Sequence, residues 1–202
     1  MYYAEFETDK YIRETFFPDL QNGVMIEVGA GPPEFFSISK HFRDNGWRCI
    51  FIDPNPKFVN QHKNLGNEIY EFACSFEEKL STFKIVNSCM WNDNDEGISY
   101  SALDIKYPMP NYTVNEISVN VIKLNSLLEQ LNVEKIDFVS IDTEGWELEV
   151  MMGFDVSKYQ PKVIVLENYQ YSDSYVEYMK SVGYELFHKI EYNYIFKNSE
   201  NK

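Results

Sequence analysis

Glycines and acidic residues follow two apolar runs near the start of the sequence. "VMIEVGAG" holds Glu27, Gly29 and Gly31, and the later run "CIFI" is followed by Asp53, 24 residues after Gly29. An acid about 20 residues beyond a glycine turn is typical of sites that bind the two hydroxyls of a ribose. A GxG alone predicts a tight strand-to-helix turn equally well. The glycines and the acid together favour a ligand that contains adenosine.

Two prolines directly after the glycines bear on the identity of this ligand. A dinucleotide rests its diphosphate on free amides at the start of a helix, and Pro32 and Pro33 carry no amide hydrogen. S-adenosylmethionine has adenosine, a sulfonium and an amino-acid end but no phosphate, and Glu27 can meet its ammonium group. The loop therefore favours S-adenosylmethionine, with a nicotinamide-dependent dehydrogenase as a weaker alternative.

Apolar runs alternate with helical patterns along the chain. Helices are predicted over residues 34–46, 56–66, 122–132, 143–153 and 172–183, and strands over 23–30, 47–56, 67–75, 136–142 and 161–168. A hairpin is predicted over 82–103, with its turn near Asn94 to Gly97, and another over 184–198. Strands that are apolar on both faces and alternate with helices predict an α/β fold, with a mainly parallel sheet between helices and an antiparallel pair at one edge.

Composition limits the class of protein and its partners. The 202 residues suit a single domain, 1–202, with a helical extension over 1–22 and the hairpin 82–103 as an insertion. Eighteen basic and 32 acidic side chains give a net charge of -14, which disfavours nucleic acid as a partner. No apolar run approaches the ~20 residues that cross a bilayer, and the N-terminus lacks a signal pattern, so we expect a cytoplasmic protein. Three cysteines without CxxC spacing indicate neither disulfides nor a zinc cluster.

Several of these segments together resemble one known family. "ETDKYIRETFF", "NGVMIEVGAG", "FIDPNP", "YEFACS", "ISYSAL" and "VIVLEN" resemble segments of the FkbM family of S-adenosylmethionine-dependent methyltransferases. The most specific segment is "IDTEGWELEVMMG", which is similar to the family signature IDxEGxExxVLxG. The resemblance implies a seven-stranded, Rossmann-like class I methyltransferase sheet and methyl transfer, commonly to a hydroxyl.

The resemblance also assigns site residues. It implies that the acids Asp142 and Glu144 lie near the transferable methyl group, and that the segment from Ala73 to Ser75 lies beside adenine. Pro32 and Pro33 depart from the small residues that many relatives have there. The predicted cofactor-binding residues are Glu27, Gly29, Ala30, Gly31, Asp53, Pro54, Cys74, Ser75 and Asp142.

Two hypotheses concern the chemistry at the later strand ends. An aliphatic hydroxyl is not ionised at neutral pH, so Asp142 or Glu144 is the candidate base, although Glu144 and Gly145 can equally well turn the chain into the next helix. Asp142, Glu167 and Asn168 follow neighbouring predicted strands, and hard oxygen ligands of this kind suit Mg²⁺. Acids at strand ends are also common without any metal.

The sequence thus predicts an S-adenosylmethionine-dependent methyltransferase that acts on a hydroxyl of a sugar, glycan or small metabolite, with Mg²⁺ as a second candidate cofactor. Two alternatives remain open. One is an N-methyltransferase on the same fold, since an amine can attack without a base. The other is a subunit that binds S-adenosylmethionine without catalysis.

Overall fold

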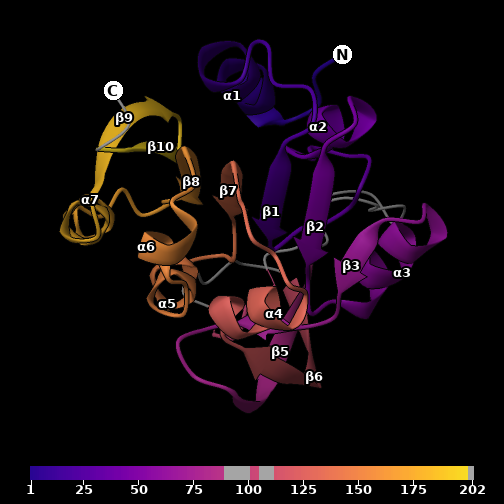
Figure 1. Ribbon diagram of the computed structural model, residues 1–202. Helices are drawn as coiled ribbons and strands as arrows, with labels where there is room; N and C mark the ends of the chain where they lie inside the picture. Colours follow the sequence, from indigo (N-terminus) through magenta and orange to yellow (C-terminus); the bar gives the residue numbers. More distant parts are fainter. Residues whose placement is uncertain (89–100, 105–111, 200–202) are drawn as a thin grey trace.

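Seven strands form the main sheet of the protein. The structure is a computed structural model that describes residues 1–88, 101–104 and 112–199 (Figure 1). Within these residues the strand order is β3-β2-β1-β7-β8-β10-β9. The strands are β1 (Val24–Val28), β2 (Arg48–Ile52), β3 (Glu68–Tyr70), β7 (Phe138–Ile141), β8 (Val163–Glu167), β9 (Tyr184–Ile190) and β10 (Asn193–Asn198). The first five in this order are parallel, and β10 is antiparallel to both β8 and β9. The predicted α/β sheet with an antiparallel pair at one edge is confirmed.

Helices cover both faces of this sheet, because the central strands are apolar on both sides. One core joins one face of the sheet to α4 (Leu124–Gln130), α5 (Glu147–Met152), α6 (Val156–Tyr159) and α7 (Ser174–Ser181). The other core joins the opposite face to α1 (Thr8–Phe16) and α2 (Lys40–Asp44). On that second side, His62 of α3 (Pro56–Asn64) contacts the ring of Phe51.

Polar residues set the starts of two helices. The Asn55 side chain accepts a backbone N–H of the first turn of α3, and Pro56 occupies a position whose amide is left unpaired in any helix. The helix predicted over 34–46 begins only at Lys40, whose amide donates to Ser37 Oγ at 3.2 Å. Phe36, with φ of 52°, lies outside the helical region. The chain between the two prolines and α2 is therefore a loop.

A second sheet was only partly predicted. Its described strands are β4 (Ala73–Cys74), β5 (Lys79–Ser88) and β6 (Tyr112–Ile122), in the order β4-β6-β5. The single strand predicted over 67–75 is divided between β3 and β4, which belong to different sheets. β5 is antiparallel to β6 over its whole length, and Ala102 forms an isolated antiparallel bridge with Lys84. The predicted hairpin turn at Asn94 to Gly97 lies outside the described residues.

The N-terminal helix α1 packs on the main sheet. Ile12 is fully buried in the core that also contains Met25 of β1 and Phe138 of β7. We propose that residues 1–202 form one domain, because α1 shares this core with the central strands. Across the described part of the chain, no helix combines the length and the apolarity that a membrane crossing requires.

Replacing Ile12 with alanine tests this packing. Deleting buried methyl groups leaves a cavity, so Ile12→Ala should lower the free energy of unfolding by about 2–5 kcal/mol, measured by urea denaturation. Leu80→Ala, at a side chain that is 70% exposed, is the control and should change stability by less than about 0.5 kcal/mol. An equal effect of the two variants would contradict the packing of α1 on the sheet.

Candidate functional site

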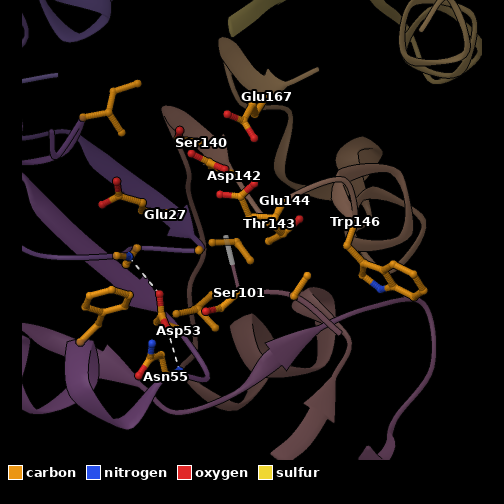
Figure 2. A pocket seen from close by; sticks show the side chains of 18 of the residues that line it. Glu27, Asp53, Asn55, Ser101, Ser140, Asp142, Thr143, Glu144, Trp146 and Glu167 are labelled. Atoms are coloured by element: carbon orange, nitrogen blue, oxygen red, sulfur yellow. Dashed lines mark hydrogen bonds between the residues drawn. The ribbon is translucent and has the colours of Figure 1, made fainter. Parts of the chain in front are cut away.

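A cavity of about 350 Å³ lies where β1 and β7 are neighbours in the sheet. The strand order reverses at this point, and parallel α/β sheets bind ligands beyond the carboxyl ends of the strands there. Ten sequence-predicted residues line the cavity, and two others, Ser75 and Asn168, do not. Those that line it are Glu27, Gly29, Ala30, Gly31, Asp53, Pro54, Cys74, Asp142, Glu144 and Glu167. Figure 2 shows Asp53 and Asn55 at one end of the cavity and the carboxyl groups of Asp142, Glu144 and Glu167 at the other.

Gly29 is required by the close approach of β1 and β7. A Cβ atom on Gly29 would lie 1.6 Å from the backbone oxygen of Asp142, and the residue has φ of +78°. Its amide donates to the Ile52 carbonyl at 2.9 Å, which joins the loop to β2 as well. Three strand ends are thereby held together without any side chain between them.

Gly31 and Asp53 form the floor at one end of the cavity. The Gly31 amide donates to Asp53 Oδ2 at 2.9 Å, and the Asn55 amide donates to Asp53 Oδ1 at 2.7 Å. Burial raises the pKa of Asp53 to about 6, and these two backbone donors oppose the rise. His62 supports the loop from below, with its Nε2 atom 3.1 Å from the Gly31 carbonyl oxygen. Burial lowers the pKa of His62 to about 4, so its ring is neutral at pH 7.

An apolar wall stands beside Asp53. It consists of Phe58, Phe72, Ala73, Cys74, Phe83, Ala102 and Leu103. Burial raises the pKa of Cys74 to about 12, so this residue is a neutral thiol. Ser75, predicted to contact a cofactor, does not line the cavity, and its Oγ atom accepts a hydrogen bond from Trp146 Nε1 at 3.2 Å. Ser75 therefore holds the indole that lines the cavity in its place.

Three carboxyl groups gather at the other end of the cavity. Asp142, Glu144 and Glu167 each place an oxygen within 4.8 Å of the other two. Burial raises the pKa of Asp142 to about 6, and burial together with the Asp142 charge raises the pKa values of Glu144 and Glu167 well above the usual value for a glutamate. Asp142 is nevertheless exposed to solvent within the cavity, so its carboxyl group is accessible to a ligand.

Asn168 is not part of this cluster, which differs from its predicted role as a metal ligand. Its Nδ2 donates to the Ser172 carbonyl and its Oδ1 accepts from the Ser172 amide, both at 2.9 Å. The side chain is buried and shapes the turn after β8. Glu144 takes the third place in the cluster instead.

The turn that presents Glu144 depends on a residue that the sequence did not single out. Glu144 has φ of 58°, a left-handed conformation that is uncommon for a side chain of its size. The fully buried Glu147 stabilises this turn, because its Oε1 accepts from the Thr143 amide at 2.8 Å and from the Gly145 amide at 3.0 Å. The Tyr175 hydroxyl donates to the other oxygen of Glu147. Glu144 thus turns the chain and also faces the cavity.

The N-terminal segment and the start of β10 complete the wall near the cluster. Glu5, Thr8, Tyr192 and Asn193 line the cavity there. The Tyr192 hydroxyl donates to a carboxylate oxygen of Glu5, a contact between residues 187 positions apart in the sequence. No local pattern reveals such a contact, so the sequence did not predict this wall.

Charge is the most unusual property of the cavity. Six carboxyl groups line it, those of Glu5, Glu27, Asp53, Asp142, Glu144 and Glu167, whereas the described lining residues include no lysine, arginine or histidine. Burial raises the pKa of Glu27 to about 8, and its Oε2 atom has no hydrogen-bond partner among the described residues. Such a cavity suits a positively charged ligand and disfavours a phosphate.

Two variants of Glu147 test its role in the turn. Glu147→Ala leaves buried amides without an acceptor and should lower the free energy of unfolding by about 2–4 kcal/mol. Glu147→Gln keeps one acceptor oxygen and should cost less than half as much, both measured by urea denaturation. Equal losses in the two variants would show that side-chain volume, and not the acceptor oxygen, stabilises the turn.

Glu27 makes stability depend on pH. Its carboxyl group has a pKa near 4.5 in the unfolded chain and about 8 in the folded one, so the folded protein holds an extra proton between these values. The free energy of unfolding should therefore fall as pH rises from about 5 to 8. Glu27→Gln cannot ionise and should flatten this decline, followed by thermal denaturation across that range. Asp53, Asp142, Glu144 and Glu167, whose pKa values are also raised, account for the decline that remains. An unchanged decline in Glu27→Gln would contradict a buried, neutral Glu27.

Comparison with known proteins agrees with this architecture. A model of the methyltransferase FkbM domain matches residues 27–186, which include the end of β1, most of the residues that line the cavity and the "IDTEGWELE" segment. A search of curated proteins gave no significant match. Because this family model spans most of the chain, the chain belongs to the FkbM methyltransferase family.

Proposed function

We propose that the protein is an S-adenosylmethionine-dependent methyltransferase that methylates a hydroxyl of a sugar, glycan or other small molecule. The observation that carries the proposal is a cavity at the switch point of the sheet, with a glycine loop at its edge and carboxyl groups as its only charged lining among the described residues. S-adenosylmethionine is cationic at its sulfonium and at its ammonium and has no phosphate. A nicotinamide dinucleotide would bring a diphosphate into a cavity that offers it no cation.

The residues present fit this cofactor. Asp53 has acceptor lone pairs left after its two backbone bonds, and these suit the ribose hydroxyls. The apolar wall around Phe72 and Phe83 suits a flat aromatic base. The unpartnered Oε2 of Glu27 suits the ammonium, whose charge would favour ionisation of this buried carboxyl group. When bound, S-adenosylmethionine supplies a methyl group on a positively charged sulfur.

The late acids account for O-methylation rather than N-methylation. A hydroxyl must lose its proton as it is methylated, and an ionised oxygen of Asp142 or Glu144 is the acceptor for that proton. A pKa raised to about 6 makes the Asp142 carboxylate a stronger base than an ordinary surface acid and leaves it mostly ionised at pH 7. An amine acceptor would need no such base, so acids of raised pKa at this end favour the hydroxyl.

Binding measurements test the cofactor. Calorimetric titration should give micromolar affinity for S-adenosylhomocysteine and no detectable binding of NAD. Asp53→Asn, which keeps the shape of the side chain but removes its charge and one acceptor, should weaken S-adenosylhomocysteine binding by about tenfold or more. Asp19→Asn, at an exposed aspartate remote from the cavity, is the matched control and should bind like the wild type. Binding of NAD, or equal affinities in the two variants, would contradict the proposal.

A screen of acceptors separates the remaining alternatives. Incubation with methyl-labelled S-adenosylmethionine and pools of polyols, glycans and amines should label a hydroxylated compound, identified by mass spectrometry. A labelled amine would favour the N-methyltransferase. Tight cofactor binding without labelling of any pool would favour a non-catalytic binding subunit. The cytoplasmic location and the absence of a nucleic-acid partner stay predictions from the sequence.

A further inference from the structure

We propose that Asp142, Glu144 and Glu167 together bind one divalent cation at the end of the cavity opposite Asp53. The chemical role of this cation rests on the proposed function, because it would lie beside the acceptor. Its binding does not rest on that function and can be measured separately. The ligand set differs from the one that the sequence predicted, since Glu144 replaces Asn168.

The geometry suits a hard cation. Three carboxylate oxygens, one from each residue, lie within 4.8 Å of one another. Oxygens on opposite sides of a Ca²⁺ ion are about 4.8 Å apart, and those around Mg²⁺ about 4.2 Å, because the metal–oxygen distances are ~2.4 and ~2.1 Å. Separations of no more than 4.8 Å are therefore compatible with a single Ca²⁺ or Mg²⁺ ion between the three oxygens. Three protein ligands also leave positions open for water or for oxygens of an acceptor.

A second observation concerns Glu167. Its side chain is only 9% exposed, and its Oε2 atom is buried without any hydrogen-bond partner in the described residues. Figure 2 shows its carboxyl group directed toward Asp142 and Glu144. A buried carboxylate oxygen without a donor is costly, and the side chain that interacts with this carboxyl group is the equally acidic Asp142. A cation would therefore satisfy an oxygen for which the described residues offer no donor.

The surroundings of the cluster add negative charge and no compensating positive charge. The charged groups that act on these three acids belong to one another and to Glu5 and Glu147, and all of them are acidic. Within the described chain, no lysine, arginine or histidine forms an ion pair with any of the three. Protons can relieve the repulsion in part, whereas one divalent cation would satisfy all three oxygens at once.

Rigidity also favours a site over a chance gathering of acids. Asp142 follows β7 at the point where its backbone touches Gly29, and Glu144 is held in its turn by the buried Glu147. Glu167 is the last residue of β8, paired with Asn193 of β10. All three ligands therefore come from backbone that is fixed independently of the cation, which is the arrangement that metal sites need.

Calorimetry on the full chain, stripped with EDTA and dialysed, tests the site. Titration with MgCl₂, CaCl₂ and MnCl₂ should reveal one cation per chain for at least one of the three salts. Glu144→Gln and Glu167→Gln should each weaken that binding by about tenfold or more, because each loses an anionic ligand. Glu27→Gln removes an acid from the same cavity but not from the cluster, so its cation affinity should stay within about threefold of the wild type.

The outcomes distinguish this proposal from the proposed function. Glu167→Gln should bind S-adenosylhomocysteine like the wild type, and Asp53→Asn should bind the cation like the wild type. Failure of all three salts to bind at millimolar concentration would overturn the cation site and leave the methyltransferase proposal intact. An equal loss of cation affinity in Glu27→Gln would also overturn it, because the general negative charge of the cavity would then explain the binding.

Discussion

The contact between Gly29 and the backbone of Asp142 is the constraint on which the site depends. Two neighbouring parallel strands end there so close together that a Cβ atom on Gly29 would overlap the carbonyl oxygen of Asp142. The same loop is bound to the end of β2 through the Ile52 carbonyl. The acids that follow these strands are consequently brought to one cavity by main-chain geometry, and their side chains do not have to attract one another.

That constraint has an electrostatic cost. It concentrates carboxyl groups in a cavity whose described lining has no basic side chain, and burial raises the pKa values of Glu27, Asp53 and Asp142. Sites that bind ligands commonly hold groups whose ionisation is unfavourable until the ligand arrives. A cationic ligand would relieve this repulsion, so the empty protein should be the less stable form.

The residues predicted from the sequence are those whose position follows from strand periodicity. Glu27, Asp53, Asp142 and Glu167 follow apolar runs, and the carboxyl ends of parallel strands meet at one edge of the sheet, so their convergence was predictable. The details of side-chain direction were not. Asn168 also follows a strand, but the chain turns back at Ser172 and both ends of its amide are used there.

Other parts of the site have no local signature at all. Glu147 looks like an ordinary residue of an amphipathic helix, and only the fold shows that its oxygen accepts the amides of the preceding turn. The second sheet was incomplete in the prediction because no strand was predicted where β6 lies, and β5 pairs with β6. Glu5 and Tyr192 meet across almost the whole chain, which periodicity cannot reveal.

This last contact has a consequence for how the family can diversify. The end of the cavity near Asp53 is built from strand ends and the glycine loop, which cannot vary without disturbing the sheet. The wall of Glu5, Thr8 and Tyr192 comes from an N-terminal segment and a hairpin, and neither Glu5 nor Tyr192 belongs to the two apolar cores of the main sheet. Substitutions of Glu5 and Tyr192 can therefore reshape this end of the cavity while the strand ends around Asp53 keep their geometry.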